Sequence, residues 1–345
     1  MQIKISNKLI SYNNQPFIIA EAGVNHNGRL DLALKLIDAA KEAGADAIKF
    51  QTFKASEVVT SFGEMADYQK KNINKKTSQQ AMLKKLELPD DFYDPIIKHC
   101  HKKDIIFLST PHGNFDSVNF LSKLVPAFKF GSGDLTNIPV LKYAAKFNKP
   151  MILGTGMATL KEVEQAINCI KSVGNNKIIL LHCTTNYPCP VEEVNLNAMK
   201  TMQKKFVDIL VGYSDHTLGV QVPLMAVLLR ASVVEKHFTL DKKMKGPDHK
   251  ASADPSELKQ LVSAIRNIPI ILGDGKKRPT PEEIKILSNV RKSVVAARNI
   301  VKGQIIKKSD IAIKRPGNGL APIYYDKIVG SVSKKDFHLD EFITL

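Results

Sequence analysis

Eight short apolar runs rich in β-branched residues occur at regular intervals in the first two-thirds of this 345-residue chain. Between them, apolar residues recur at three- and four-residue spacing, and this spacing predicts helices, as at 31–43, 159–172 and 255–268. Eight strands alternating with helices over about 250 residues indicate a (β/α)8 barrel, or TIM barrel, with a parallel sheet buried on both faces. The eight predicted strands are 17–21, 45–50, 104–109, 127–132, 150–155, 177–183, 208–213 and 232–237.

One long insertion breaks this alternation. Residues 53–90 follow the second predicted strand and include the polar stretch YQKKNINKKTSQQ. Loops of this length in a compact domain are usually functional or disordered. Because loops after barrel strands lie at the active-site end, we expect this one to be a lid or a partner-contact loop.

A change in composition near residue 273 predicts a second domain. We expect a barrel domain at 1–272, a linker at 273–290 (GDGKKRPTPEEIKILSNV) and a small domain at 291–345. The small domain combines short strand-like runs (SVVAA, DIAIK, FITL) with turns, and it holds 11 Lys and Arg against 5 Asp and Glu. A β-rich domain of this size buries little core, so we expect it to dock onto another surface.

The formal net charge of +16 suggests nucleic acid at first sight, but only seven of the 50 basic residues are arginine. Base recognition and phosphate clamping favour arginine, and the chain has no tryptophan, so we predict no nucleic-acid partner. A solvated lysine-rich surface explains the charge most simply. The alternative is a positive field that attracts small phosphates or carboxylates.

Several features favour a reducing, aqueous compartment. The longest apolar stretch, from Val222 to Val234, contains Arg230 and is too short to span a bilayer. The N-terminal residues lack the pattern of a secretory signal. The four cysteines form no CxxC pair, which favours reduced thiols. We therefore expect a cytoplasmic protein with no membrane partner.

Polar side chains stand at the ends of nearly all the predicted strands, where barrel enzymes place their catalytic groups. Such a ring predicts an active site at one mouth of the barrel. Its members are Glu21, Asn25, Lys49, Gln51, Thr110, Lys129, Ser132, Thr155, Thr185, Tyr187, Ser214, Asp215, His216, Glu235 and His237.

Lys49 and Lys129 are compatible with three roles. One lysine forms a Schiff base with a carbonyl substrate, or both bind phosphate and carboxylate groups, or both are buried partners of Glu21 or Glu235. Two lysines beside serine, threonine and glycine donors favour an anion-binding cradle.

His216 and His237 end neighbouring strands, so their imidazoles can share one divalent metal ion. Asp215 or Glu235 is the expected supporting carboxylate. The loop GPDHKAS after the last strand begins with a turn, and it offers Asp248 and Ser252 to a bound substrate.

An ordered set of motifs resembles the sialic acid synthases. The motifs are FIIAEAGVNHNG, AIKFQTFK, FLSTP, FKFGSGD, GTGM, LHCTTNYP, VGYSDHT, EKHFTLD and GPDHKAS. The tail, with RKSVVAARNIVKGQII and KRPGNG, resembles the family's C-terminal antifreeze-like (SAF, β-clip) domain. The resemblance covers almost the whole chain. It implies condensation of phosphoenolpyruvate with an N-acyl mannosamine-type sugar in a homodimer that exchanges its C-terminal domains.

The resemblance also implies roles for individual residues. His216 and His237 would bind Mn²⁺, or alternatively Mg²⁺ or Co²⁺, and would act in catalysis with Glu21. The phosphoenolpyruvate site would comprise Lys49, Gln51, Thr110, Lys129, Ser132 and Thr185. The sugar site would comprise Tyr187, Ser214, Glu235 and Asp248, with Arg315 supplied by the partner subunit's tail domain.

Three positions depart from the family pattern. Gly154 stands where a serine is usual, Asp134 stands where a glutamate is usual, and the family's asparagine before Tyr-Pro falls at Thr185 or Asn186. The motif forms favour a legionaminate synthase. An N-acetylneuraminate synthase is the alternative, and a Schiff-base aldolase or a sugar- or ice-binding module built on the tail is more distant.

Overall fold

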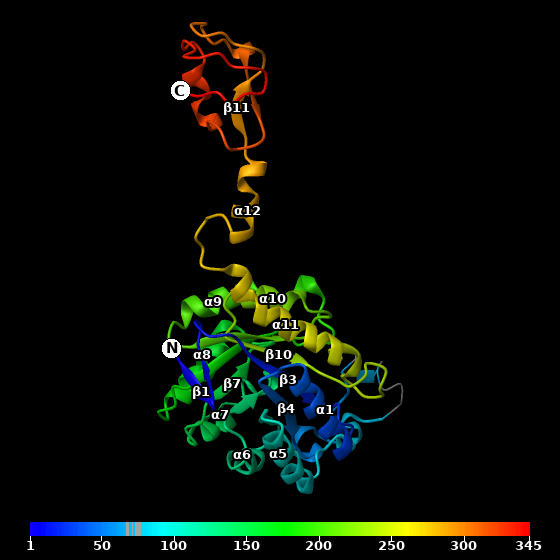
Figure 1. The fold of residues 1–345 in the computed structure, drawn as a ribbon. Coiled ribbons are helices and arrows are strands. Elements are labelled where there is room, and N and C mark those ends of the chain that lie inside the picture. Colours follow the sequence, from blue (N-terminus) through cyan, green and yellow to red (C-terminus); the bar gives the residue numbers. More distant parts are fainter. Residues whose placement is uncertain (67–68, 71, 73–76) are drawn as a thin grey trace. The chain divides into compact units, whose positions relative to one another are not determined.

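The computed structural model describes residues 1–66, 69–70, 72 and 77–345. These form two compact units, Met1–Leu272 and Gly273–Leu345 (Figure 1). Among the described residues, no helix combines the length and the apolarity needed to cross a membrane.

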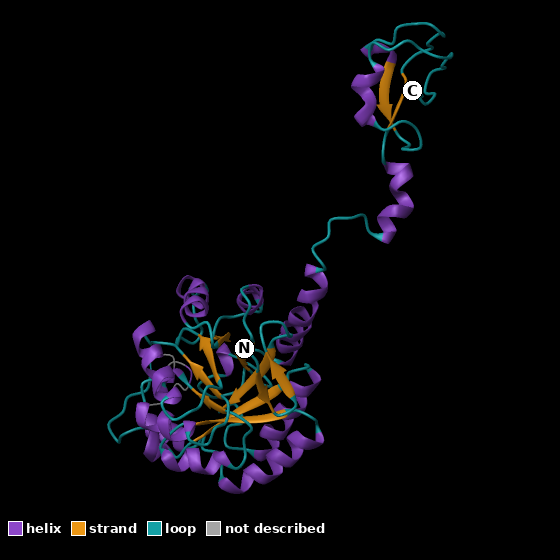
Figure 2. Ribbon diagram, turned by 90° about the vertical axis from the view of Figure 1, so that its left-hand side faces the viewer, coloured by secondary structure: helices purple, strands orange, loops and turns teal. Residues whose placement is uncertain are grey.

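The first unit is a parallel eight-stranded barrel, as predicted from the sequence. Each predicted apolar run overlaps one strand, and the strands lie at the centre with helices around them (Figure 2). The order β5-β4-β3-β10-β9-β8-β7-β6 places the first and last strands of the barrel side by side, and β5 also contacts β6. The barrel is therefore nearly closed. The strands are β3 (Phe17–Gly23), β4 (Ala47–Thr52), β5 (Ile106–Pro111), β6 (Phe128–Phe130), β7 (Met151–Gly154), β8 (Ile178–His182), β9 (Leu210–Asp215) and β10 (Val233–His237).

A helix follows every barrel strand and packs its apolar face against the sheet. In α1, the residues Leu36, Ile37 and Ala40 are fully buried because they share one face of the helix. In α8, a capping box between Thr159 and Glu162 sets the start of the helix. The outer helices are α1 (Leu30–Glu42), α5 (Tyr93–Lys102), α6 (Phe115–Ser122), α7 (Ile138–Ala145), α8 (Leu160–Lys171), α9 (Asn197–Lys205), α10 (Gln221–Leu228) and α11 (Pro255–Leu272).

A short hairpin closes the N-terminal end of the barrel. Strands β1 (Ile3–Ile5) and β2 (Lys8–Ile10) pair in antiparallel register. Their buried isoleucines share one apolar cluster with inward residues of the barrel strands, including Phe17 and Leu210. The sequence does not predict this hairpin, because three-residue strands are too short to show alternation.

The insertion at 53–90 contains more structure than the expected loop. It holds the short helices α2 (Ala55–Val58) and α4 (Gln79–Lys84), and Met65, Met82 and Leu86 are buried in an apolar cluster with Phe53. Residues 67–68, 71 and 73–76 of the predicted lid lie outside the described residues. The described remainder is anchored to the barrel domain.

The second unit begins within the segment predicted as a linker. Helix α12 (Pro281–Val290) occupies part of that segment, with a capping box formed by Thr280 and Glu283. Strands β11 (Ser293–Ala296) and β12 (Ile311–Lys314) then pair antiparallel, and α13 (Tyr325–Ile328) follows. Their apolar side chains form a separate core that includes Val294, Ile306 and Phe337. The unit is β-rich with its own small core, as its composition indicated.

Candidate active site

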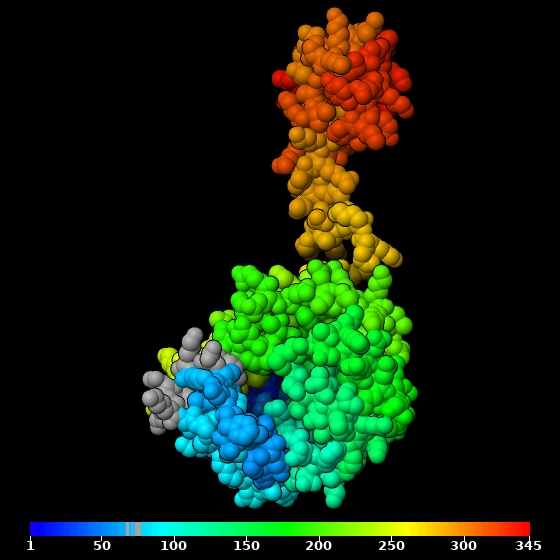
Figure 3. All heavy atoms as spheres, turned by 180° about the vertical axis from the view of Figure 1, so that it is seen from behind, coloured from blue at the N-terminus to red at the C-terminus, as the bar shows by residue number. Residues whose placement is uncertain are grey.

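A cavity of about 290 Å³ opens at the carboxyl ends of the barrel strands. Figure 3 shows this hollow, with dark blue residues near the N-terminus at its floor. Nearly all the barrel residues predicted as site residues line it, so the predicted convergence is observed. They are Glu21, Lys49, Gln51, Thr110, Lys129, Ser132, Thr185, Tyr187, Ser214, His216, Glu235, His237 and Asp248.

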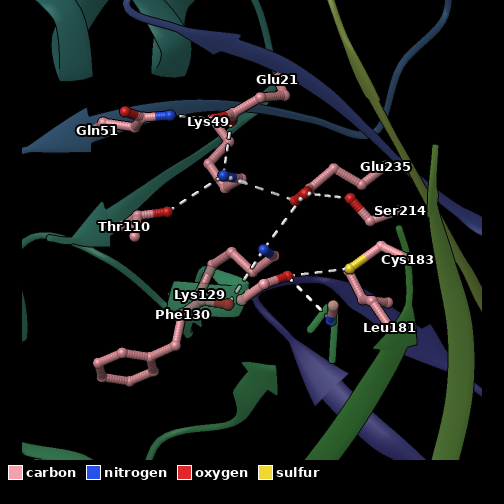
Figure 4. Close-up of polar contacts among 12 residues, drawn as sticks. Glu21, Lys49, Gln51, Thr110, Lys129, Phe130, Leu181, Cys183, Ser214 and Glu235 are labelled. Carbon is pink, nitrogen blue, oxygen red and sulfur yellow. Dashed lines mark hydrogen bonds and ion pairs between the residues drawn. The ribbon is translucent and has the colours of Figure 1, made fainter. Parts of the chain in front are cut away.

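Lys49 is the centre of a buried charge network at the floor of the cavity (Figure 4). Its Nζ lies 2.7 Å from Glu21 Oε2 and donates to Thr110 Oγ1 at 3.1 Å. Gln51 Nε2 donates to Glu21 Oε1 at 3.0 Å. The register that pairs Glu21 with Lys49, and Gln51 with Thr110, brings these side chains together.

Glu235 links both lysines. Its Oε1 lies 3.3 Å from Lys129 Nζ and accepts a 2.9 Å hydrogen bond from Ser214 Oγ, while its Oε2 lies 3.7 Å from Lys49 Nζ. Each lysine therefore has a buried glutamate beside it. This is the arrangement expected if the lysines are buried partners of Glu21 or Glu235. Glu235, assigned to the sugar by resemblance, contacts both lysines that were assigned to phosphoenolpyruvate, and Ser214 contacts Glu235.

Burial and neighbouring charges perturb the protonation of these groups. Burial raises the pKa of Glu21, although Lys49 partly opposes the shift. Burial alone would lower the pKa of Lys49, but Glu21 and Glu235 raise it above its ordinary value. Burial alone would raise the pKa of Glu235, but Lys129 and Lys49 lower it to about 2. The Lys49 ammonium group and the Glu235 carboxylate are thus charged at neutral pH.

The two predicted metal-binding histidines do meet. The ring centroids of His216 and His237 are 5.4 Å apart, and the Tyr187 ring lies 4.2 Å from that of His216. Burial lowers the pKa of both histidines, so both rings are neutral at pH 7. The His216 Nδ1 bonds the carbonyl oxygen of Thr184 at 2.6 Å, which leaves Nε2 as the unprotonated nitrogen.

Asp215 does not act as the expected supporting carboxylate for His216. Its side chain lies against Lys236 Nζ at 2.5 Å and accepts hydrogen bonds from Tyr213 and Thr217. The backbone carbonyl of Thr184 orients His216 instead. Neighbouring residues of a strand point to opposite faces, which places Asp215 and Lys236 outside the barrel lumen.

The loop after β10 presents Asp248 to the cavity. Asn25 holds this loop through hydrogen bonds from its Nδ2 to Phe238 O at 2.8 Å and to Ser252 Oγ at 3.0 Å. Burial and the charge of Glu21 raise the pKa of Asp248 to about 7. The Asn-His-Asn-Gly turn after β3 thus positions the loop, and Ser252 supports the loop from within it.

The structure distinguishes Thr185 from Asn186. The Thr185 hydroxyl is buried at the cavity without a hydrogen-bond partner among the described residues. The Asn186 side chain is exposed and donates to Glu193 Oε2 at 3.1 Å. Gly154 and Asp134 are the other two positions that depart from the family pattern. A Cβ on Gly154 would lie 3.1 Å from Ser132 Oγ, and Asp134 Oδ2 forms a hydrogen bond with His112 Nδ1 at 2.8 Å.

Sequence reasoning missed several residues that line the cavity. His112 follows the Pro111 end of β5, and Cys183 follows the His182 end of β8, so the strand-end rule applied to the whole chain would have found both. Described residues of the 53–90 insertion, including Val59, Met82 and Leu83, also line the cavity. Arg315 is exposed in the second unit, directly after β12.

A buried ring of lysines, carboxylates, hydroxyls and neutral histidines at this end of a (β/α)8 barrel defines a barrel enzyme. The chain belongs to the NeuB family, whose profile matches residues 36–277, and residues 291–345 match the SAF domain. The resemblance noted from the sequence motifs is therefore confirmed.

Two relatives share high similarity along nearly the whole chain. The N,N'-diacetyllegionaminic acid synthase of Campylobacter jejuni is 48% identical, covering 94% of this chain and 98% of that protein. The enzyme of the same name from Legionella pneumophila is 48% identical, covering 91% and 89%. The structure of N-acetylneuraminic acid (sialic acid) synthetase from Leptospira borgpetersenii, in complex with citrate, has a TM-score of 0.71 at 35% identity, covering 83% of this chain and 94% of that one.

Proposed function

We propose that this enzyme condenses phosphoenolpyruvate with 2,4-diacetamido-2,4,6-trideoxymannose and water, giving N,N'-diacetyllegionaminate and phosphate. Identity of 48% to two synthases of that product, against 35% to a sialic acid synthetase, supports this sugar over N-acetylmannosamine. The observation that carries the proposal is the convergence of two lysines, two neutral histidines and a raised-pKa glutamate in one cavity.

The side chains of the cavity suit the two ends of phosphoenolpyruvate. Lys49 and Lys129 provide buried ammonium groups, while Thr110, Ser132 and Thr185 provide hydroxyls. Charge-assisted hydrogen bonds of this kind bind phosphate and carboxylate oxygens strongly. Gln51 keeps Glu21 in place beside Lys49.

The reaction forms one C–C bond and one C–O bond to water, breaks the C–O bond to phosphate, and protonates the aldehyde oxygen to a hydroxyl. The enol carbon of phosphoenolpyruvate attacks the sugar aldehyde, and water adds to the neighbouring carbon, which bears the phosphate. Phosphate then leaves with its bridging oxygen, and the carbon becomes a ketone. Glu21 accepts the proton of the attacking water, a role suited to a carboxylate whose pKa burial raises. Tyr187 and Asp248 contact the sugar, whose orientation decides which face reacts.

His216 and His237 are the residues that would hold a divalent cation. They fit one because both are neutral and buried, and because His237 Nδ1 has no hydrogen-bond partner among the described residues. When bound, such an ion polarises the aldehyde oxygen as a Lewis acid. We favour Mn²⁺, with Mg²⁺ and Co²⁺ as alternatives, since imidazole and oxygen ligands suit several divalent ions.

The charge balance of the cavity also supports a cation. Glu21 and Glu235 stand against Lys49 and Lys129, so the lysines contribute little excess positive charge. A substrate carrying both a phosphate and a carboxylate needs more positive charge than this network supplies. A divalent ion on the histidines would provide it.

The Schiff-base alternative is disfavoured by the state of Lys49. A nucleophilic amine needs a lowered pKa, whereas the adjacent carboxylates raise that of Lys49. Borohydride reduction in the presence of the sugar or pyruvate tests this. A covalent adduct on Lys49 or Lys129 would support an aldolase, and no adduct is expected.

The deciding experiment measures phosphate released from phosphoenolpyruvate in the presence of Mn²⁺. N-acetylmannosamine and 2,4-diacetamido-2,4,6-trideoxymannose are compared, each with and without EDTA. We expect release with the second sugar that EDTA abolishes and added Mn²⁺ restores. Equal or faster turnover of N-acetylmannosamine would assign an N-acetylneuraminate synthase instead, and no release with either sugar would refute the synthase proposal.

We also propose a homodimer in which Arg315 of the partner subunit completes each sugar site. A cation near the sugar would offset the carboxylate of Asp248. Mixing refolded or co-expressed Arg315→Ala and Lys49→Met chains tests the exchange. Restored activity in mixed dimers would support it, because one barrel then has both residues intact. Inactive mixed dimers would show that Arg315 serves its own barrel or none.

The four cysteines are free thiols, three of them buried, which fits a reducing compartment. We propose the cytoplasm as the site of the reaction, and fractionation of cells expressing the protein tests it. Recovery of the enzyme outside the cytoplasmic fraction would contradict this.

A further inference from the structure

Ser132 Oγ has two hydrogen-bonding neighbours, and together they determine whether its own hydrogen is free to bind a ligand. The Gly156 N–H donates to it at 3.1 Å, and the sulfur of Cys183, which is labelled in Figure 4, lies 3.1 Å away. A serine hydroxyl has one hydrogen and two lone pairs. Because Gly156 fills one lone pair, the direction of the Cys183 hydrogen bond decides whether the serine hydrogen is used internally or remains available.

The Cys183 thiol keeps its proton at neutral pH. Burial raises its pKa, and this outweighs the opposing contact with Ser132 and the charge of Lys129. The side chain is 5% exposed. A protonated thiol in this place is a weak donor, and its sulfur is a weak acceptor. An incoming anion is a far better acceptor for the Ser132 hydrogen than the sulfur is.

Ser132, Cys183 and Thr185 line the same cavity. A Cβ on Gly156 would lie 2.2 Å from Thr185 Oγ1 and 2.8 Å from Ser132 Oγ, so both hydroxyls lie close against Gly156. Thr185 Oγ1 is buried and has no hydrogen-bond partner among the described residues. An unpartnered buried hydroxyl beside a second one indicates a ligand oxygen that both bind.

We propose that Cys183 is a positioning residue that makes Ser132 a dedicated hydrogen-bond donor to the phosphate of phosphoenolpyruvate. When the anion enters, the Cys183 S–H donates to Ser132 Oγ, the Gly156 N–H fills the second lone pair, and the Ser132 O–H points to phosphate. The inference rests on the proposed function for the identity of the anion. It assigns the cysteine no covalent chemistry, since its raised pKa makes it a poor nucleophile.

Three single variants separate this role from simple packing. Cys183→Ala removes the donor, Cys183→Ser keeps a donor of similar size, and Cys189→Ala is the matched control. Cys189 is equally buried in the same loop, but its Sγ donates to Pro190 O at 3.3 Å instead of contacting Ser132.

We expect Cys183→Ala to raise the KM for phosphoenolpyruvate about three- to tenfold, the range of one lost hydrogen bond, with the KM for the sugar unchanged. Cys183→Ser should restore the KM for phosphoenolpyruvate to within about twofold of the parent enzyme, and Cys189→Ala should leave it unchanged. Equal defects in Cys183→Ala and Cys183→Ser, or an unaltered KM in Cys183→Ala, would overturn the proposal.

A double-mutant cycle with Ser132→Ala gives the most specific result. If Cys183 acts through Ser132, then Cys183→Ala has no further effect on the KM for phosphoenolpyruvate once Ser132 is alanine. Additive effects would show that Cys183 acts independently and would refute the positioning role.

Calorimetry of inorganic phosphate binding tests the Cys183 inference independently of the proposed reaction. The wild-type protein should bind phosphate, and Cys183→Ala should weaken that binding by a factor similar to the rise in KM. This pattern without any synthase turnover would retain the Cys183 inference and reject the proposed substrates. Absence of phosphate binding to the wild type would reject the Cys183 inference itself.

Discussion

The two ends of the barrel differ sharply although the same strands form both. At the N-terminal end, strands begin with apolar residues such as Phe17 and Val233, which the β1–β2 hairpin covers. At the C-terminal end, the same two strands present Glu21, Glu235 and His237 to a cavity. Apolar burial stabilises the fold, whereas buried ion pairs return little free energy after desolvation. The N-terminal end of the barrel therefore provides stability, whereas the C-terminal end keeps buried charges for chemistry despite the free energy lost on their desolvation.

Replacing Lys49 should produce the largest functional effect. Lys49→Met removes the ammonium group shared by Glu21, Glu235 and Thr110, so we expect kcat/KM to fall by about 10³. Steady-state phosphate release measures it. Lys8→Met is the control, since Lys8 lies at the other end and forms a half-exposed pair with Asp46. Turnover of Lys49→Met within tenfold of the parent enzyme would contradict the assigned role.

Removing apolar contacts at the N-terminal end of the barrel should lower stability and leave catalysis intact. Ile5 is fully buried in the apolar cluster of the hairpin, so Ile5→Ala should lower the free energy of unfolding by about 3 kcal/mol. Urea unfolding followed by circular dichroism measures this. Leu9→Ala, at a position 46% exposed in the same hairpin, should change stability by less than about 0.5 kcal/mol. An altered KM in Ile5→Ala would show that the two ends are coupled.

The buried His26 ring at the active-site end makes the stability of the protein depend on pH. Burial lowers its pKa to about 4 from 6.5, so the stability that the neutral ring contributes is complete above pH 6.5 and is lost as the pH falls toward 4. Between about pH 7.5 and pH 5, this one group should account for about 2 kcal/mol of lost stability. Urea unfolding of His26→Asn at both pH values should show a correspondingly smaller loss. Identical pH profiles for the variant and the parent would refute this assignment.

The smallest predicted effect separates two neighbouring residues at the cavity rim. Thr185→Val should raise the KM for phosphoenolpyruvate about tenfold, because its buried hydroxyl lines the same cavity as Ser132. Asn186→Ala should leave this KM within about twofold, since its side chain bonds Glu193 at the surface. The reverse pattern would place Asn186 in the substrate site.

The sequence predicted the barrel well because its evidence is local. All eight strands and the helices at α1, α8 and α11 lie where periodicity placed them, within a few residues. The β1–β2 hairpin and the helix α12 were missed: the hairpin strands are short, and the Thr280–Glu283 capping signal lay inside a polar, lysine-rich segment. Asp215 or Glu235 was expected as the supporting carboxylate, and the structure excludes Asp215, because alternation along β9 directs it away from the lumen.

Residue types and their order along the chain determined the architecture and the list of polar strand ends, because strand and helix periods are local properties of the sequence. Only the tertiary structure decided which of these side chains touch. Glu21 meets Lys49, Glu235 meets both lysines, and Ser132 meets Cys183 across 51 residues. Those contacts depend on the register of neighbouring strands and on closure of the barrel, and both arise only when distant segments pack together.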